Sequence, residues 1–466
     1  MSGPWSGRRL HFIGVGGAGM SGYARAAHAL GAEVSGSDGA DGPYLRRLAG
    51  DGVLDARIGH RAENIPAGDD VEVFHSSAVG EENVERAAAR ERGLSDRPRA
   101  ELLGELSAMR RTIAVAGTHG KTTTASMIAH ALSAAGMRPG WLVGAPIGGG
   151  LPNARWDEGD WLVVEADESD RSMLSLNVEV AVLTNVELDH HATFASLVEL
   201  EGAFQDFLAL AEKGVVLWDR PQLLALGEAA IAAGEEAVGR PAVELVRYDV
   251  PDPGLERGGS RFRWRGHEVR LQVPGAHNAL DAVGALEAVR MTGADAELAI
   301  SGLEAFRGAG RRFQLLGRSS RGALVYEDYA HHPTEIEATL RAARTLEPAR
   351  LVAVFQPHLF SRTALLSREF ARALALADVV AVLEVYPARE RAKDYPGVSG
   401  LLIARACADA ARGRPVFWLP SFSDAEPVLR GLLEDSDVCL VMGAGDIDGL
   451  ARALVDASET DAGAPA

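Results

Sequence analysis

A phosphate-binding loop is indicated by residues 116–123, which read Ala-Gly-Thr-His-Gly-Lys-Thr-Thr. The apolar run Thr112–Ala116 predicts a buried strand before the loop, and a helix is expected to continue to about Ala135. The N–H groups at the start of such a helix, together with its dipole, attract phosphate. Lys121 would reach the terminal phosphates of a nucleotide, and the Thr122 hydroxyl would face Mg²⁺. The predicted nucleoside-triphosphate site consists of Gly117, Thr118, His119, Gly120, Lys121, Thr122 and Thr123.

This loop is a short variant of the common phosphate-loop pattern. The strict eight-residue form would place glycine at position 115, and this chain has Val115. The alternative is a lysine-bearing turn that binds nothing. The strand before it, the helix after it and the run Thr122–Thr124 weigh against that alternative.

Two further loops carry acidic and histidine side chains directly after apolar runs. Glu165 closes the predicted strand Trp161–Glu165 and begins an acidic stretch that ends at Asp170. The segment Asn185–His191 follows the predicted strand Val180–Leu183 and includes Asp189, His190 and His191. Solvated acidic loops and surface histidine pairs are common. Both segments, however, follow predicted parallel strands, where such sheets place their ligands, and ATP requires a metal ion beside its phosphates.

A second glycine-rich turn lies near the N-terminus. Gly14-x-Gly16-x-x-Gly19 follows the predicted strand Leu10–Ile13 and precedes a helix, and Asp38 comes nineteen residues after the last glycine. This pattern is the dinucleotide-binding fingerprint. Its physical requirement is a pyrophosphate near a helix N-terminus, which a UDP-sugar also carries. The turn alone therefore leaves both a nicotinamide dinucleotide and a UDP-sugar open.

The N-terminal glycine turn and the phosphate loop belong to the first two of three successive βα segments, and the third starts near Arg311. The chain of 466 residues is longer than one hydrophobic core usually serves. We expect an α/β protein with three domains, each with a mostly parallel sheet flanked by helices. The first and third would be Rossmann-like and the second ATPase-like. The predicted domains span residues 1–107, 108–309 and 310–466. Residues 261–273 instead alternate as an antiparallel hairpin, and the third domain is expected to contain the strands Ala323–Tyr326, Leu351–Phe355, Val379–Leu383 and Val438–Met442.

The bulk composition narrows the class of partner. Apolar residues make up 47% of the chain and charged residues 24%, which is typical of a folded protein. The net charge of -18 argues against a nucleic-acid partner or an anionic membrane surface. Two cysteines and an N-terminus without an apolar run favour a soluble, cytoplasmic protein that does not insert into a membrane.

Taken together, the motifs resemble the Mur ligases, the ATP-dependent amide-forming enzymes of peptidoglycan precursor synthesis. The resemblance runs from His11 to about Gly445. Its motifs are residues 11–22, 117–124, 165–170, 185–190, 274–278, 311–313, 328–333, 355–358 with Arg362, and 386–390. The sequence departs from the usual family pattern at Ala192, Glu327 and Leu359.

The resemblance implies a role for each domain. The first would hold the UDP-sugar of the substrate. The second would bind ATP, with Thr122 and Glu165 on one Mg²⁺ ion and His190 on a second. The UDP-sugar-binding residues would be Gly14, Gly16, Gly17, Ala18, Gly19, Met20, Ser21, Asp38, Ser76 and Ser77. ATP would also contact His277, Asn278 and Arg312, the amino acid would contact His331, His358 and Arg389, and the catalytic residues would be Lys121, Glu165, His190, Asp328, His332 and Arg362.

The implied reaction transfers the γ-phosphoryl group of ATP to the lactyl carboxylate of UDP-N-acetylmuramate, and an amine then attacks the acyl phosphate. Members that add later amino acids typically carry a carbamylated lysine about fifteen residues after the metal histidine. This chain has Gln205 there and no lysine between Thr124 and Lys213, which favours addition of L-alanine. We expect a monomer or weak homodimer. The alternatives are a ligase for a preformed murein tripeptide, a nicotinamide-dependent oxidoreductase and a non-catalytic nucleotide-binding module.

Overall fold

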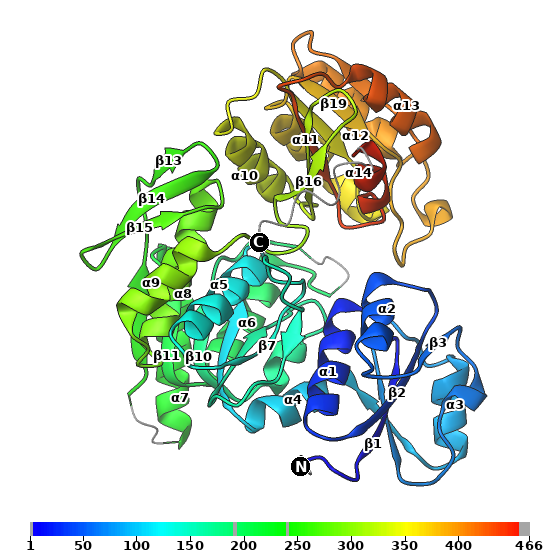
Figure 1. Cartoon of the computed structure of the whole chain (residues 1–466), viewed down its shortest axis with the longest axis vertical. Coiled ribbons are helices and arrows are strands. Elements are labelled where there is room, and N and C mark those ends of the chain that lie inside the picture. The colour runs from blue at the N-terminus through cyan, green and yellow to red at the C-terminus, as the bar shows by residue number, and fades with distance from the viewer. Residues whose placement is uncertain (1–2, 190–192, 239–241, 456–466) are drawn as a thin grey trace. The chain divides into compact units, whose positions relative to one another are not determined.

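The computed structural model describes residues 3–189, 193–238 and 242–455, and the chain has the predicted α/β fold (Figure 1). It divides into two compact units, which are described separately below. The first unit comprises Met1–Asp249 and Asp281–Leu303, and the second comprises Val250–Leu280 and Glu304–Ala466.

The first sheet of the first unit has five parallel strands in the order β3-β2-β1-β4-β5. The strands are β1 (Arg9–Ile13), β2 (Glu33–Asp38), β3 (Ala56–Ile58), β4 (Val71–His75) and β5 (Ser95–Pro98). The helices are α1 (Ala18–Ala29), α2 (Pro43–Gly50), α3 (Val84–Glu91) and α4 (Arg99–Ala108), and the 3₁₀ turn is η1 (Ala62–Asn64). The strand order reverses between β1 and β4, so a crevice for a ligand is expected at their carboxyl ends.

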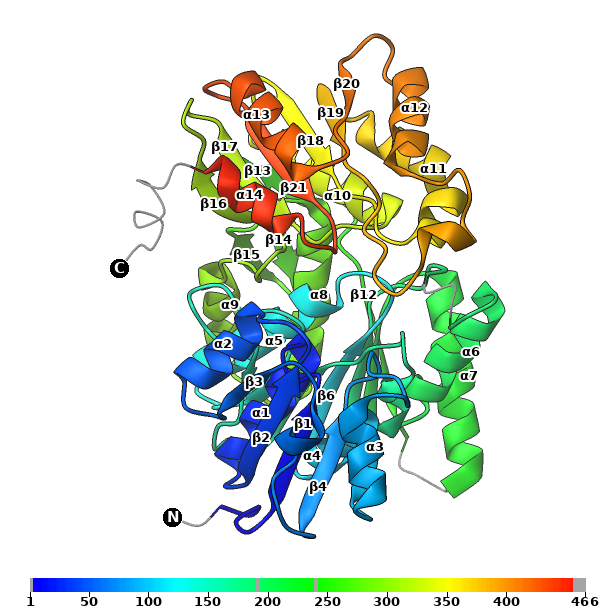
Figure 2. The same ribbon diagram turned by 90° about the vertical axis from the view of Figure 1, so that its right-hand side faces the viewer.

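The second sheet has seven strands in the order β12-β11-β10-β6-β9-β7-β8, and only the β7–β8 pair is antiparallel. Its strands are β6 (Arg111–Ala116), β7 (Gly140–Leu142), β8 (Ala154–Arg155), β9 (Trp161–Glu165), β10 (Val178–Leu183), β11 (Ala211–Trp218) and β12 (Glu244–Tyr248). The helices are α5 (Lys121–Ala134), α6 (Leu197–Leu208) and α7 (Pro221–Val238), and η2 spans Ser172–Ser175. Helices α6 and α7 lie side by side (Figure 2).

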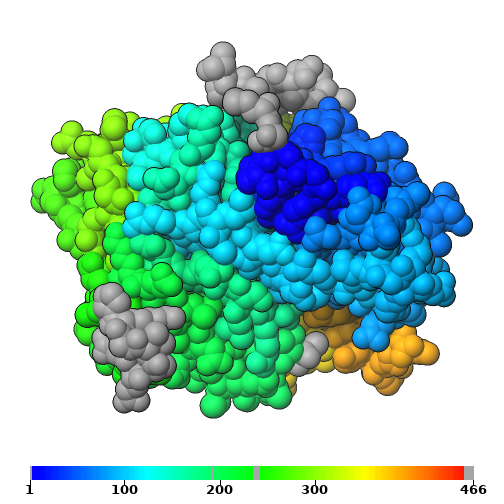
Figure 3. Space-filling view, turned by 90° about the horizontal axis from the view of Figure 1, so that it is seen from below, coloured from blue at the N-terminus to red at the C-terminus, as the bar shows by residue number. Residues whose placement is uncertain are grey.

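The two sheets of the first unit share a packed boundary. On the face in Figure 3, residues from the N-terminal part of the chain (blue) lie directly beside residues that come later in the sequence (cyan). Helix α1 contacts β8 there, and a Cβ atom at Gly22 would lie 3.1 Å from the Cβ of Ala154. Glycine at position 22 therefore allows α1 to approach the second sheet closely.

The second unit contains a three-stranded antiparallel sheet, β13 (Gly254–Glu256), β14 (Gly259–Trp264) and β15 (His267–Leu271). Its larger sheet has the order β16-β17-β21-β18-β19-β20, with only β16 antiparallel. These strands are β16 (Gln314–Arg318), β17 (Leu324–Asp328), β18 (Leu351–Phe355), β19 (Val379–Val382), β20 (Val416–Trp418) and β21 (Val438–Met442). Its helices are α10 (Pro333–Arg344), α11 (Phe360–Leu374), α12 (Gly400–Ala410), α13 (Phe422–Leu432) and α14 (Asp448–Leu454), with η3 at Ala392–Asp394. Most of the residues of α8 (Ala276–Arg290) and α9 (Ala296–Ala305) belong to the first unit.

The strands expected from apolar runs are all present, and the expected hairpin is β14–β15. The alternation of Arg and apolar residues in β14 gives it one wet face, since Arg261 and Arg263 are exposed while Phe262 and Trp264 are buried. The central strands are buried on both sides. All five residues of β18 and all five of β21 are no more than 2% exposed.

A buried carboxylate ties together four segments around the first sheet. Glu85 on α3 accepts hydrogen bonds from Ser37 Oγ at 2.7 Å, Asn64 Nδ2 at 2.7 Å and the Arg61 backbone N–H at 3.0 Å. His11 Nε2 lies 3.0 Å from the same carboxylate, and both side chains are fully buried. Burial alone would raise the pKa of Glu85, but the hydrogen bonds from His11, Asn64 and Ser37 prevail and lower it to about 2.

We predict that Glu85→Ala lowers the free energy of unfolding by about 3–5 kcal/mol, because it leaves several buried donors without their acceptor. The stabilisation by Glu85 should be complete above its unfolded pKa of about 4.3 and should be lost as the pH falls toward 2. Chemical denaturation across this pH range measures both effects.

Glu72→Ala is the matched control. Glu72 accepts from Arg8 at 2.7 Å in a half-buried ion pair of the same sheet, and its loss should cost at most about 1 kcal/mol. Equal losses in the two variants would contradict the role assigned to Glu85.

Candidate active site

Three strand ends of the second sheet meet at one edge of the first unit. Val115 of β6 is in register with Glu165 of β9, and Ala116 is in register with Leu183 of β10. The loops after these strands are the phosphate loop, the acidic loop and the segment that begins at Thr184. Parallel pairing therefore brings the three predicted motifs of this domain together.

The phosphate loop requires glycine at two positions. Gly117 has φ +131° and Gly120 has φ +82°, a region that residues with a side chain rarely adopt. A Cβ atom at position 117 would collide with Thr184 Oγ1, and one at position 120 would lie 2.8 Å from Asp281 Oδ1. Gly120 is the N-cap of α5, so the loop ends at a helix start with its N–H groups directed toward the loop.

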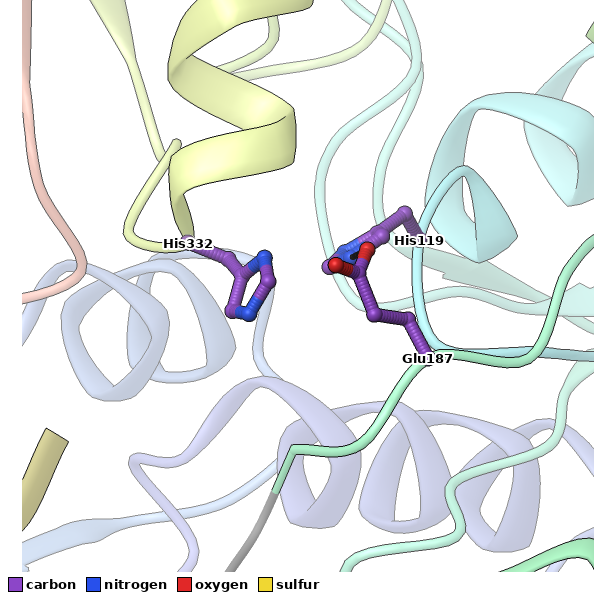
Figure 4. A group of neighbouring side chains, drawn as sticks. All are labelled: His119, Glu187 and His332. Carbon is purple, nitrogen blue, oxygen red and sulfur yellow. Dashed lines mark hydrogen bonds and ion pairs between the residues drawn. The ribbon is translucent and has the colours of Figure 1, made fainter. Parts of the chain in front are cut away.

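The loop after β10 fixes the backbone of the phosphate loop. Thr118 Oγ1 donates to Glu187 O at 2.8 Å and accepts from the Glu187 N–H at 2.9 Å. The Asn185 amide spans the His119 peptide groups, accepting from His119 N–H and donating to His119 O, both at 2.9 Å. His119 Nε2 lies 3.1 Å from Glu187 Oε2, and the two side chains face each other in Figure 4. These contacts hold the backbone of the phosphate loop in one conformation.

Lys121, the first residue of α5, is surrounded by oxygen atoms. Its ammonium group donates to Gly117 O at 2.5 Å and Thr118 O at 3.0 Å, and pairs with Glu168 at 3.0 Å. Burial would lower the pKa of Lys121, but the charges of Glu168, Asp167 and Glu165 outweigh it and raise that pKa. The lysine is therefore held fully charged beside the loop.

Thr122 and Glu165 form the second polar pair of this edge. Thr122 Oγ1 donates to Glu165 Oε1 at 2.8 Å, and Glu165 Oε2 accepts from the Gly144 N–H at 2.6 Å. A hydroxyl and a carboxylate are the hard oxygen ligands that Mg²⁺ prefers, and Thr122 directly follows Lys121 in α5. The donor set at this edge therefore fits a magnesium ion.

The N-terminal glycine turn lies at the carboxyl ends of β1 and β4. A Cβ atom at Gly14, which has φ +80°, would lie 3.0 Å from the Ser76 Cβ, so the turn and Ser76 are adjacent. Asp38 Oδ2 accepts from the Gly16 N–H at 2.8 Å, and Asp38 Oδ1 accepts from the Ala40 N–H at 3.1 Å. Both oxygens of Asp38 therefore hydrogen-bond to the backbone. In nicotinamide enzymes with this fingerprint, the acid binds the ribose instead.

The other predicted UDP-sugar residues differ in exposure. Gly17 is the N-cap of α1, and Ser77 is exposed. Met20 and Ser21 are each 2% exposed, and Ser21 Oγ donates to Ala18 O at 2.9 Å. Direct contact of a ligand with these two side chains stays a prediction.

In the second unit, Asp328 ends β17 and is 6% exposed. Its Oδ2 accepts from the Phe313 N–H and its Oδ1 from the Ala330 N–H, both at 2.7 Å. Burial raises the pKa of Asp328 to about 6, against the opposing charge of Arg312 and these two hydrogen bonds. The carboxylate joins the segment before β16 to the segment after β17.

His331 and His332 precede α10. His332 is the buried N-cap of this helix, and its Nδ1 accepts from the Thr334 N–H at 3.4 Å (Figure 4). Glu335 Oε2 accepts from the backbone N–H groups of His331 at 2.9 Å and His332 at 3.2 Å. The reciprocal capping box fixes both histidines at the helix start.

Aromatic rings continue this cluster toward α11. The His331 ring meets the His358 ring edge to face at 5.9 Å, and the His358 ring stacks on Tyr386 at 5.8 Å. Arg362, which is 2% exposed, donates to His358 Nδ1 at 3.2 Å. Four of the predicted C-terminal residues, His331, His332, His358 and Arg362, are thus held in one region of this unit, and Arg389 is exposed.

Arg312 lies 5.0 Å from the centroid of the Tyr329 ring, and Arg311 lies 4.9 Å from it. Asn278, in the first turn of α8, donates to Pro274 O at 2.6 Å and is buried, and His277 beside it is partly exposed. His190, predicted as a metal ligand, and Ala192 lie outside the residues that the structure describes.

Several polar residues near the site were missed by the sequence analysis. Glu168 pairs with Lys121, Arg99 pairs with Asp167 and Asp170, and Asn153 Nδ2 donates to Ala18 O at 2.8 Å. Arg99 is a cation in the first turn of α4, where the helix dipole disfavours positive charge.

Family models match nearly the whole chain. Residues 9–111 match the catalytic domain of the Mur ligase family, residues 115–289 match the Mur ligase middle domain, and residues 311–445 match the Mur ligase glutamate ligase domain. Among the described residues, none of the helices combines the length and hydropathy that crossing a bilayer requires.

Individual relatives align over similar lengths. A UDP-N-acetylmuramate–L-alanine ligase from Rubrobacter xylanophilus is 45% identical and covers 94% of this chain and 97% of its own length. A ligase of the same name from Saccharopolyspora erythraea is 43% identical and covers 98% of this chain and 94% of its own length.

Solved structures agree with the fold. The UDP-N-acetylmuramate–alanine ligase MurC of Thermotoga maritima matches with a TM-score of 0.81 at 26% identity, over 97% of this chain and 99% of that one. A murein peptide ligase from Psychrobacter arcticus matches with a TM-score of 0.70 at 24% identity, over 97% and 100% of the two chains. The second likeness concerns the fold alone.

We predict that Asp328→Asn gains stability relative to the unchanged protein as the pH rises from about 4 to about 7. The carboxyl has a pKa of about 6 when folded and about 3.9 when unfolded, so the folded state binds more protons in this range and loses stability as they leave. The stability gap between the two proteins should shift by up to about 3 kcal/mol, because asparagine does not titrate.

Asp378→Asn is the matched control, measured by the same denaturant titrations. Arg344 lies 2.8 Å from Asp378 and helps to lower the pKa of that carboxyl, so the stability gap of its variant should change mainly below about pH 4 and little from about 4 to about 7. If the Asp328→Asn gap did not change with pH, burial would not control this carboxyl.

Proposed function

Because the chain belongs to the Mur ligase family, we propose that it joins L-alanine to the lactyl carboxylate of UDP-N-acetylmuramate at the expense of ATP. The products are UDP-N-acetylmuramoyl-L-alanine, ADP and phosphate. The observation that carries this proposal is the 43–45% identity, over 94–98% of the chain, to relatives that bear the name of this ligase. The reaction is a step of peptidoglycan precursor synthesis, and thereby serves cell-wall biogenesis, cell shape and division.

The chemistry explains why the phosphate loop is needed. A carboxylate acylates poorly, because its leaving group would be oxide. Transfer of the γ-phosphoryl group to the lactyl carboxylate makes an acyl phosphate, which the alanine amine attacks with loss of phosphate. Lys121 and the N–H groups at the start of α5 neutralise and position the terminal phosphates, which is most of what phosphoryl-transfer catalysis requires.

A lysine fits position 121 better than an arginine would. The chain contains only three lysines, Lys121, Lys213 and Lys393, although arginines are abundant. A compact ammonium group can contact Gly117 O, Thr118 O and Glu168 within one small shell, where a planar guanidinium would need more room. The same compactness suits a group that must follow the transferred phosphate.

We also propose that Mg²⁺ binds at this edge. Thr122 and Glu165 would hold one ion, and His190 would hold a second. When bound, magnesium neutralises charge on the β- and γ-phosphates of ATP. The Gly144 N–H keeps Glu165 oriented toward Thr122 in either case.

The remaining site residues are proposed by domain, with boundaries at residues 1–107, 108–309 and 310–466. The first domain holds the UDP-sugar at the turn from Gly14 to Gly19, beside Ser76. The third provides His331, His358 and Arg389 for the amino acid. Arg362 orients His358 through its 3.2 Å hydrogen bond, and His332 or Asp328 accepts the proton that the attacking amine loses. The enzyme acts in the cytoplasm, where ATP and UDP-sugars are made, as a monomer or weak homodimer.

Two observations weigh against the alternatives. The oxygens of Asp38 are engaged by the backbone of Gly16 and Ala40, which disfavours a nicotinamide dinucleotide. The ordered contacts of Lys121, Thr122 and Glu165 speak against a non-catalytic nucleotide-binding module. The murein tripeptide ligase shares the fold and is separated by the assay below.

We predict ATP-dependent phosphate release when the protein is given UDP-N-acetylmuramate and L-alanine with Mg²⁺. Release should require all three substrates, and single amino acids tested in turn should rank L-alanine first. A coupled phosphate assay, with identification of the product by mass, measures this. Release with the tripeptide L-alanyl-γ-D-glutamyl-meso-diaminopimelate but not with L-alanine would overturn the proposal in favour of the tripeptide ligase.

We predict that Lys121→Ala lowers kcat at least about a thousandfold, because the charge on the transferred phosphoryl group loses its main protein cation. Lys213→Ala is the matched control, since Lys213 donates to Met291 O away from the loop and its loss should leave kcat unchanged. Circular dichroism and thermal unfolding establish that both variants fold. Substantial activity in a folded Lys121→Ala protein would refute the role of the loop.

A further inference from the structure

The acidic loop after β9 divides its four carboxylates among three partners. Glu165 pairs with Thr122 and Glu168 with Lys121, so these two serve the phosphate loop. Asp167 and Asp170 instead face Arg99, at 3.0 Å and 2.7 Å. A loop of six residues thus connects the phosphate site to an arginine of another part of the unit.

Arg99 belongs to the sugar-nucleotide half of the first unit, that is, the part that contains the first sheet, where the UDP-sugar is proposed to bind. It is the first residue of α4, which follows β5 of the first sheet, whereas the acidic loop follows β9 of the second. Its Nη1 would lie 2.9 Å from a Cβ atom at Gly19, so the guanidinium borders the N-terminal glycine turn, and glycine there leaves room for it. The side chain is only 13% exposed.

The position of Arg99 is energetically unfavourable for a cation unless nearby anions compensate. The first turn of a helix disfavours a cation, and a largely buried guanidinium also loses hydration. Asp167, Asp170 and the Ser172 hydroxyl, 3.4 Å away, provide the compensating contacts. In return, Arg99 neutralises two carboxylates that would otherwise stand beside the site of a triphosphate.

We propose that Arg99 is a positioning residue for the ATP site, supplied by the sugar-nucleotide half of the unit. By holding Asp167 and Asp170, it leaves Glu165 and Glu168 to face Thr122 and Lys121, and it keeps surplus negative charge away from the phosphates. The inference rests on the proposed function only in taking ATP as the nucleotide. It assigns to Arg99 a part in both substrate sites, since the same side chain borders Gly19.

The test is the binding of the non-hydrolysable analogue AMP-PNP with Mg²⁺, measured by calorimetry without the UDP-sugar. Arg99→Met should weaken binding about tenfold, because Asp167 and Asp170 then repel the phosphates and compete for Lys121. Adding Asp167→Asn and Asp170→Asn to Arg99→Met should restore most of the affinity, which a purely structural role would not do. Arg99→Lys, which keeps the charge without the fork, should lose less than Arg99→Met.

Arg97→Met is the matched control. Arg97 lies two residues earlier and pairs with Glu101 and Glu105, both at 2.6 Å, so its loss should leave AMP-PNP binding unchanged. Equal affinity of the unchanged protein and Arg99→Met, or no recovery in the triple variant, would overturn the inference. If Arg99→Met does not fold, Arg99→Lys with and without Asp167→Asn provides the same comparison. If AMP-PNP binding behaves as expected but ATP releases no phosphate in the presence of UDP-N-acetylmuramate and L-alanine, the proposed substrate is wrong and the inference about Arg99 still holds.

Discussion

One ammonium group, largely removed from water, sets the requirements of the edge where ATP is proposed to bind. Lys121 must stay charged to bind phosphate, and burial alone would favour its neutral form. Oxygen atoms from Gly117, Thr118 and Glu168 therefore surround it. Each of these contacts depends on a particular feature of the fold. The carbonyl groups require the tight turn of the loop, and Glu168 requires β9 to end beside β6.

The strand register brings the loops that contact Lys121 to the same edge of the sheet. The pairing of Val115 with Glu165 and of Ala116 with Leu183 places three loops at the same level of the sheet. The close approach of Gly117 to Thr184 then lets the third loop hydrogen-bond to the first. Because register in a sheet with two buried faces is strongly specified, the apolar core positions the polar site indirectly.

The sequence was sufficient for the fold class and for the places of the motifs. Apolar runs followed by glycine or acidic residues mark the ends of buried parallel strands. This pattern is local in the sequence, so it can be recognised without knowledge of the tertiary contacts. Short edge strands such as Ala56–Ile58 and Val416–Trp418 were missed. Ala56–Ile58 contains no continuous apolar run, and the short run at Val416–Trp418 lies between Pro415 and Pro420. Their pairing depends on the neighbouring strand rather than on their own residues.

The partners of the motif residues were not predictable in the same way. Arg99 and Asp170 are 71 positions apart, and Lys121 and Glu168 are 47 apart. Such pairs depend on helix packing and strand order, which no local pattern encodes. The motif around the N-terminal glycines also could not show which side chains face a ligand, and in the structure Met20 is buried in the core.

Three buried carboxylates show how the number of donors, more than burial, decides their chemistry. Glu85 is fully buried, yet its five close donors lower its pKa to about 2. Asp328 has two backbone donors, and burial prevails and raises its pKa to about 6. Glu327, beside it on β17, lies 3.1 Å from Arg311 without hydrogen-bond geometry, and its pKa is also raised.

This difference fits what each group does. A carboxylate with many donors is permanently ionised and can hold segments together, as Glu85 does around the first sheet. A carboxylate with few donors can change its protonation near neutral pH at little cost, which a group that receives a proton from an attacking amine requires. Asp328 is of the second kind, since its pKa of about 6 lies close to the pH at which a cell works. The number of N–H and O–H groups that the fold directs at each carboxylate therefore decides whether it stays ionised or can change its protonation near neutral pH.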